Sequence, residues 1–116
     1  MIHKYAQRMK EAPLHQLTQE TREWIHQVGG GYFDVLTNMA MLTEEVGEVA
    51  RIVARRYGQQ TEKESDRTKD LGVELADVLF VVLCLADQTG TDMQQAWERR
   101  MKEKSERDQS RFQHRK

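Results

Sequence analysis

The stretch VELADVLFVVLCLA, residues 73–86, carries two acidic residues, Glu74 and Asp77, among apolar ones and contains no basic residue. Its apolar side chains point in several directions around a helix, and a helix that is apolar all round is buried on all sides. Carboxylates are rarely placed where water is scarce unless something compensates their charge. The stretch therefore predicts a central helix and raises the question of what neutralises its two acids.

Four segments of the chain are predicted to be helical, and a glycine-containing break lies between each helix and the next. The polar residues 59–70 lack hydrophobic periodicity and are interpreted as a solvated loop or a frayed helix start. Thr91 is the expected N-cap of the last helix. Long helices joined by short turns indicate an all-α fold, an antiparallel bundle of about four helices. The predicted helices span residues 14–28, 33–57, 70–88 and 92–112.

The second of these helices is amphipathic, and acidic residues lie beside its apolar stripe. The helix at 70–88, in contrast, leaves no face for solvent, and a chain of 116 residues can hardly bury such a helix by itself. We therefore expect subunits to pack around it in a homo-oligomer. The stripe consists of Val35, Leu42, Val46, Val49 and Val53, with Glu44, Glu45 and Glu48 next to it.

The bulk properties indicate a single domain that works in the cytoplasm. The N-terminus has no apolar segment typical of a secretory signal, and the longest apolar run, residues 78–86, is shorter than the roughly 20 residues of a bilayer span. Cys84, the one cysteine, is interpreted as a small buried apolar residue in a reducing compartment. The formal net charge of -1 favours neither membrane nor nucleic acid as a partner. Residues 1–13 are assigned to an N-terminal extension and 113–116 to a flexible tail.

Two short motifs place carboxylates in pairs: EEVGE at 44–48 and ELAD at 74–77. Residues three apart are neighbours on a helix surface, so antiparallel helices with these pairs facing bring four acids into one pocket. Such a group repels itself unless protons or a cation are bound, and oxygen-rich sites suit Mg²⁺ or Mn²⁺. The four predicted metal ligands are Glu45, Glu48, Glu74 and Asp77.

Two other interpretations of these acids stay open. Paired acids on a helix usually lie on a solvated face, and this applies above all to the EEVGE motif. The acids of the apolar helix could instead form salt bridges with Arg51, Arg55 or Arg56. Taken together, the two pairs favour a metal site over buried ion pairs.

The last predicted helix carries a basic stripe on one face, at i, i+4, i+7 and i+11: Arg100, Lys104, Arg107 and Arg111. A concentrated positive stripe is a candidate polyphosphate contact, and a solvated charged face is the equally good alternative. No interleaved aromatics or reading motif support nucleic acid. Acids that hold Mg²⁺ and a basic stripe are the two parts of a phosphoanhydride site.

With these motifs the chain resembles the MazG-like nucleotide pyrophosphohydrolases of the all-α NTP pyrophosphatase superfamily, in their small single-domain YpjD-like branch. The family pattern, E-E-x-x-E followed by E-x-x-D, is present at 44–48 and 74–77, and the flanking blocks extend the match over most of residues 22–112. The resemblance implies a homodimer or homotetramer and Mg²⁺-dependent hydrolysis of a nucleoside triphosphate, with Mn²⁺ as a substitute. The products are the monophosphate and pyrophosphate, and a role in removing unwanted nucleotides is one expectation.

The resemblance also implies roles for individual residues. Glu45 is implied as a ligand and, with Glu44 supporting the ligands or orienting the water, as a catalytic carboxylate. Arg107 and Arg111 match positions that contact phosphate, and Lys104 extends that surface. Ser105 replaces the usual asparagine, and its shorter side chain has no amide to offer to a sugar or phosphate. Trp24 is a candidate for stacking on the base, with a core position as its alternative. Two rival functions are a nucleotide or metal sensor without turnover and a structural helical bundle.

Overall fold

The computed structural model describes residues 13–59 and 63–113. In these ranges the chain is all-α and has no strand, as predicted, and each long helix begins and ends within about two residues of its expected bounds. The polar stretch is not entirely loop, because it contains the short helix α4. The expected N-terminal extension and C-terminal tail lie almost wholly outside the described residues. The helices are α2 (Leu14–Gln27), α3 (Val35–Tyr57), α4 (Glu64–Arg67), α5 (Leu71–Gln88) and α6 (Met93–Gln113).

Aspartates cap three of the helices. Asp34 and Asp70 precede α3 and α5, and the carboxylate of each accepts a hydrogen bond from a backbone N–H of the first turn, at 2.9 and 2.7 Å. Asp92 does the same for α6, where its carboxylate accepts a hydrogen bond from the backbone N–H of Gln95 at 3.0 Å. The prediction of Thr91 as this N-cap is wrong, because the hydroxyl of Thr91 is occupied by that of Thr89, at 2.8 Å.

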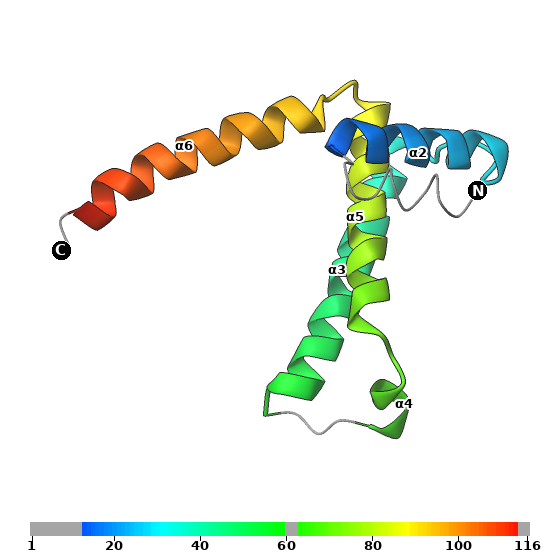
Figure 1. Cartoon of the computed structure of the whole chain (residues 1–116). Helices are drawn as coiled ribbons and strands as arrows, with labels where there is room; N and C mark the ends of the chain where they lie inside the picture. Colours follow the sequence, from blue (N-terminus) through cyan, green and yellow to red (C-terminus); the bar gives the residue numbers. More distant parts are fainter. Residues whose placement is uncertain (1–12, 60–62, 114–116) are drawn as a thin grey trace, which may run out of the picture.

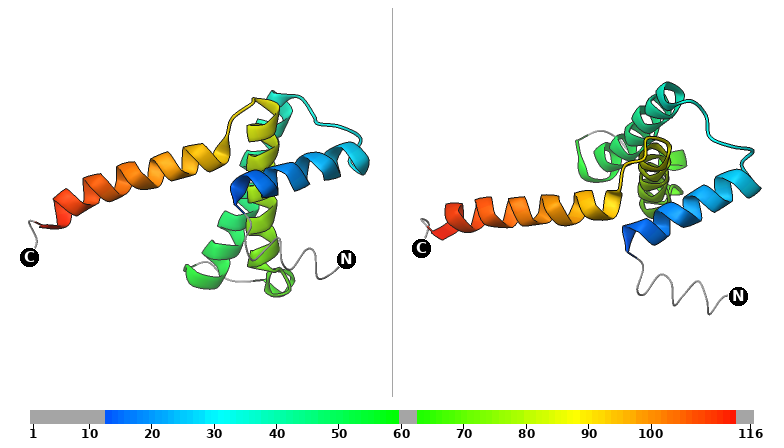
Figure 2. Two further views of the ribbon diagram at one scale, coloured as in Figure 1. Left: turned by 45° about the horizontal axis from the view of Figure 1, so that its top comes forward. Right: turned by 90° about the horizontal axis from the view of Figure 1, so that it is seen from above.

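The framework of the chain is an antiparallel hairpin of α3 and α5 (Figure 1). Helix α2 crosses α5 near the end of the hairpin where α5 finishes. Helix α6 leaves from that same end and projects away from the hairpin, as all three views in Figures 1 and 2 show. The side chain of Gln94 in α6 accepts a hydrogen bond from the backbone N–H of Leu14, which fastens the base of α6 to α2.

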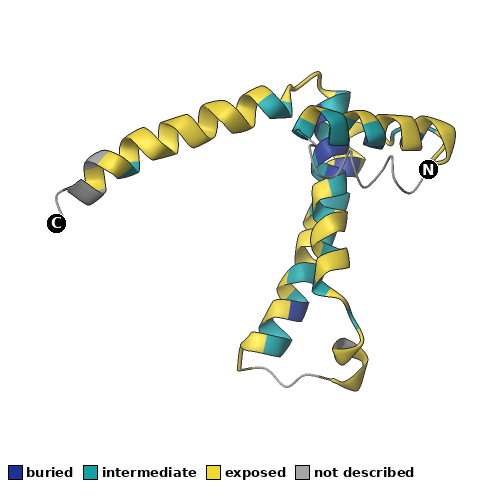
Figure 3. Cartoon of the chain, viewed as in Figure 1, coloured by how far each residue is buried: buried dark blue, intermediate teal, exposed yellow. Residues whose placement is uncertain are grey.

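Most of the buried residues lie near the crossing of α2 over the hairpin (Figure 3). Cys84 is 3% exposed, which confirms its predicted burial, and desolvation raises the pKa of its thiol to about 11. Ile52 is the most deeply buried large side chain of the described core. The buried apolar residues are Ile25, Ile52, Val81, Leu83, Cys84 and Ala86.

The half of the hairpin that α2 does not reach is open on its outer side (Figure 3). Leu75 and Leu79 are 50% and 43% exposed, so the single chain does not bury this helix on all sides, as its short length led us to expect. The predicted apolar stripe of α3 is only partly covered: Leu42 is half-buried, whereas Val46 and Val53 are exposed. The reason is that α5 covers only one face of α3 and no other described helix covers the opposite face.

Two polar networks fasten the other elements to the end of α5. The carboxylate of Asp87 accepts hydrogen bonds from the Arg22 guanidinium in α2 and, at 2.6 Å, from the Tyr32 hydroxyl. Buried Asn38 of α3 donates to the side chain of Gln88 at 2.6 Å. Because these bonds join residues far apart in the chain, they set how α2 and α3 lie against α5.

None of the helices in the described ranges combines the length and hydropathy that a membrane span requires.

Candidate functional site

Three carboxylates from two helices meet on the facing sides of the hairpin. Glu45 belongs to α3, and Glu74 and Asp77 belong to α5. One oxygen of each lies within 4.8 Å of the others. We call these residues the acidic trio. The antiparallel arrangement of α3 and α5 therefore brings together three of the four predicted metal ligands.

The trio is electrostatically unfavourable in the absence of a counter-ion. Desolvation raises the pKa of Glu45, and the negative charges of Asp77 and Glu74 raise it further. Both causes disfavour the ionised form of this carboxyl. The repulsion anticipated from the sequence is thus present around Glu45.

The donor set of the trio fits a hard divalent cation. Carboxylate oxygens are the ligands that Mg²⁺ and Mn²⁺ prefer, and two oxygens that bind one Mg²⁺ lie at most about 4.2 Å apart. The spacing of the trio is within a small side-chain rotation of that limit. The three carboxylates could therefore hold such an ion, and water or substrate oxygens would complete its coordination.

The fourth predicted ligand, Glu48, is not a member of this group. Its Oε2 lies 3.4 Å from the ammonium of Lys69, in the segment that leads into α5. The carbonyl of Lys69 accepts a hydrogen bond from the guanidinium of Arg56, one of the arginines considered as a partner for the acids. Sequence reasoning missed Lys69, because it is one of several basic residues in the polar stretch before the ELAD motif and no pattern singles it out. Glu44, the other candidate catalytic carboxylate, is exposed on α3 next to Glu45.

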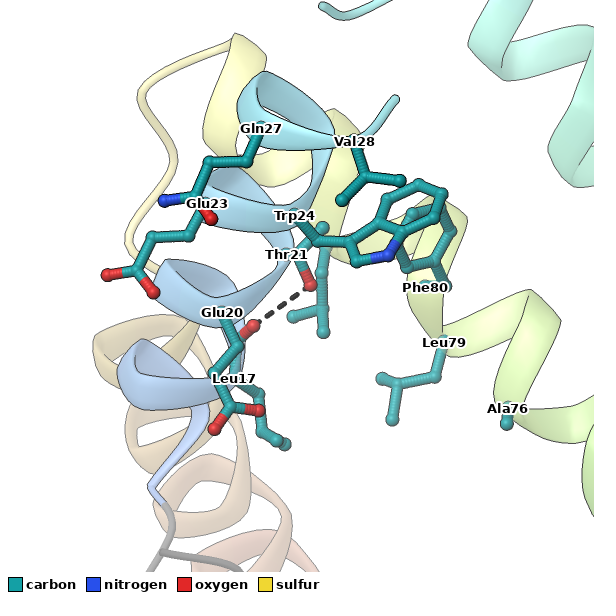
Figure 4. Close-up of a pocket in the computed structure, with 11 residues that line it drawn as sticks. Leu17, Glu20, Thr21, Glu23, Trp24, Gln27, Val28, Ala76, Leu79 and Phe80 are labelled. Atoms are coloured by element: carbon teal, nitrogen blue, oxygen red, sulfur yellow. Dashed lines mark hydrogen bonds between the residues drawn. The ribbon is translucent and has the colours of Figure 1, made fainter. Parts of the chain in front are cut away.

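A cavity of about 580 Å³ opens between α2 and α5. Ala76 and Phe80 line the cavity and are close to Asp77 in the sequence of α5. No member of the trio lines it, so the cavity and the trio lie on different sides of this helix. Trp24 packs edge-to-face on Phe80, with ring centroids 5.6 Å apart (Figure 4). The indole is 50% exposed, so the core interpretation of Trp24 does not describe its position.

The basic stripe lies apart from the trio in a single chain. All of its residues are exposed on α6, which projects away from the hairpin (Figure 2). Arg100 and Arg107 form ion pairs within α6, with Glu103 at 3.4 Å and Asp108 at 3.1 Å, and exposed pairs of this kind contribute little. Ser105 is exposed on the same helix. The stripe consists of Arg100, Lys104, Arg107 and Arg111.

Comparison with known proteins finds relatives of the same size and fold. The model of the MazG nucleotide pyrophosphohydrolase domain matches residues 33–112. YpjD of Bacillus subtilis (strain 168), a protein described as uncharacterized, is 38% identical over 104 residues, which are 90% of this chain and 94% of YpjD.

Two crystal structures resemble the chain closely. The structure of YpjD from Bacillus subtilis superposes with a TM-score of 0.67 at 39% identity, over 78% of this chain and 92% of YpjD. The structure of a Bacillus-conserved MazG protein, described as a nucleotide pyrophosphohydrolase, superposes with a TM-score of 0.64 at 36% identity, over 78% and 86% of the two chains.

Proposed function

The chain belongs to the MazG nucleotide pyrophosphohydrolase family, and we propose that it hydrolyses nucleoside triphosphates to monophosphate and pyrophosphate in a metal-dependent reaction. The observation that carries this proposal is the acidic trio, in which α3 and α5 aim three carboxylates at one point. Removal of non-standard nucleotides from the cellular pool is the physiological role that we assign to this reaction.

Glu45, Glu48, Glu74 and Asp77 are the proposed ligands for Mg²⁺, with Mn²⁺ as a substitute. When bound, the cation lowers the pKa of an attacking water and neutralises phosphate charge. The acidic trio supports this choice, because it offers only oxygen donors and their spacing suits a hard cation.

A carboxylate also acts as the general base that accepts the proton of the attacking water. Glu45 belongs to the trio, and Glu44 precedes it on α3, so either side chain can orient the water and accept its proton. The water attacks the α-phosphorus, the bond between the α-phosphorus and the bridging oxygen breaks, and the oxygen leaves with pyrophosphate.

The proposed phosphate contacts are Arg107, Arg111 and Lys104. Because α6 projects away from its own trio, these cations would serve the site of a neighbouring copy of the chain. Their guanidinium and ammonium groups would neutralise the charge that develops on the leaving pyrophosphate.

A homodimer or homotetramer is part of the proposal. The open half of the hairpin exposes apolar side chains from both helices, among them Val46, Val53 and Leu75. Contiguous exposed apolar surface typically marks a protein interface. A second copy on this surface would bury it and would give α5 the burial that its sequence demands.

Trp24 is the proposed stacking partner for the base. Its exposed indole lines the cavity of about 580 Å³ between α2 and α5, and a nucleotide with its phosphates at the trio could place its base there. A cavity of this size is typical of small-molecule sites.

The decisive experiment is a pyrophosphate-release screen over standard and modified nucleotides with Mg²⁺ or Mn²⁺, repeated with Asp77→Asn. The proposal expects release by the native chain and none by the variant. A sensor would bind nucleotide in calorimetry without releasing pyrophosphate. A structural bundle would show no change in melting temperature with Mg²⁺ and nucleotide, whereas a ligand of the folded state raises it.

A further inference from the structure

Glu48, the predicted metal ligand that is not part of the acidic trio, forms an ion pair with Lys69. The ammonium of Lys69 lies 3.4 Å from Oε2 of Glu48, and the two side chains are 39% and 42% exposed. Glu48 follows Glu45 by three residues on α3, so both side chains lie on the same face of the helix. Glu48 is therefore close enough in the fold to belong to the site, but its charge is already paired.

Hydrogen bonds to the backbone at and near Lys69 fix its position, in addition to the ion pair. The guanidinium of Arg56, two turns beyond Glu48 on α3, donates to the carbonyl of Lys69 and, at 3.5 Å, to that of Arg67. The next residue, Asp70, caps α5. These bonds hold Lys69 between the two helices of the hairpin, where its ammonium can reach α3.

We propose that Lys69 is a built-in counter-ion that competes with the divalent cation for Glu48 and so sets the concentration at which the site fills. This inference rests on the proposed metal site and concerns its regulation. Without metal, the ammonium offsets part of the repulsion among the acids. When metal binds, Glu48 exchanges Lys69 for the cation, and the loss of the ion pair reduces the net binding free energy.

The size of the effect follows from the exposure of the pair. Partly exposed ion pairs are weak, so removal of Lys69 should tighten metal binding by about two- to fivefold. Lys69 is thus a positioning residue, and its effect is expected in metal affinity measured without nucleotide.

The test is calorimetric titration of the full chain with Mn²⁺ alone, comparing the native protein with Lys69→Met and Lys69→Gln. Both variants should bind Mn²⁺ about two- to fivefold more tightly and should melt at a lower temperature in EDTA than the native chain. Lys102→Met is the matched control, because it removes the same charge from an exposed position on α6 and should change neither quantity.

A double-mutant cycle separates the ion pair from a general effect of charge. In a Glu48→Gln background, Lys69→Met should leave Mn²⁺ affinity unchanged, and equal tightening in both backgrounds would overturn the inference. Native protein that binds Mn²⁺ while both Lys69 variants bind equally or more weakly would overturn the inference and leave the metal site standing. Native protein that binds no Mn²⁺ would remove the metal site and the inference together.

Discussion

Glu45 on α3 and Asp77 on α5 present carboxylate oxygens within 4.8 Å of one another across the hairpin, and Glu74 joins them. The charge of Asp77 adds to desolvation in raising the pKa of Glu45. A pair of this kind is unfavourable in the empty protein and becomes favourable when a cation binds between its members. The predictions below start from this relationship and from the surfaces around it.

Replacement of Asp77 should abolish catalysis and preserve the fold. Asp77→Asn removes one negative ligand, and we expect pyrophosphate release to fall by about 100-fold or more. The helical circular dichroism should stay unchanged, because the side chain is at the surface of the hairpin. Mg²⁺ and nucleotide should raise the melting temperature of the native protein and should raise that of the variant much less. Substantial turnover by Asp77→Asn would contradict the proposed site.

Neutralising Glu45 should stabilise the metal-free protein. Because folding raises the pKa of this acid, ionisation costs stability, and the cost grows as pH rises through the unfolded pKa toward the folded one. Glu45→Gln should therefore melt higher than native protein in EDTA at neutral pH, and the difference should shrink on acidification. Glu106→Gln, an exposed acid on α6, is the control for loss of one charge. A lower melting temperature for Glu45→Gln in EDTA would argue against repulsion in the trio.

The network around Asp87 should make stability depend on acid pH. Hydrogen bonds from Arg22 and then Tyr32 hold the pKa of Asp87 below its usual value. Its contribution is thus present above the unfolded pKa of about 3.9 and is lost as pH falls through the lower folded value. Asp87→Asn should cost about 1–3 kcal/mol at pH 7, because it removes a charged acceptor from both donors.

Chemical denaturation between pH 7 and pH 3 measures this effect. The native protein and Asp87→Asn should converge in unfolding free energy below about pH 4. A constant difference over that range would show that the charge of Asp87 is not the cause.

Tryptophan fluorescence can locate the nucleotide base. The chain has two tryptophans, and Trp97 lies on the exposed α6. In Trp97→Phe the remaining indole, Trp24, should be quenched when nucleotide and Mg²⁺ are added. Trp24→Phe is the reciprocal variant, in which Trp97 should respond little. We expect Trp24→Ala to raise KM about 5- to 150-fold with a smaller change in kcat, since base–aromatic stacking is worth about 1–3 kcal/mol.

A charge on the open face of the hairpin should weaken self-association. Leu75→Lys places an ammonium on the exposed apolar surface of α5, and light scattering after size-exclusion chromatography should show a smaller species than for the native chain. Activity should fall with it, because the proposed phosphate contacts come from a second copy. Gln95→Lys adds the same charge to α6 without loss of apolar surface and should leave the mass unchanged. A native chain that is already monomeric would contradict the oligomer.

Much of the architecture was determined by the sequence, because it depends on local spacing. Glycine-containing breaks and the run of apolar and amphipathic segments between them defined the long helices to within about two residues. The pairing of acids at i and i+3 depends only on helical geometry, so the facing carboxylates of α3 and α5 could be anticipated once an antiparallel hairpin was assumed.

Tertiary structure alone decided which charges meet. Lys69 approaches Glu48, and Arg22 with Tyr32 approaches Asp87, because the connections after α3 and α2 bring distant segments back to the hairpin. The direction of α6 and the uncovered side of α5 also follow from how whole helices pack, and helical periodicity carries no information on that packing. An all-apolar helix indicates that burial is required, but a single chain does not contain every surface that provides it.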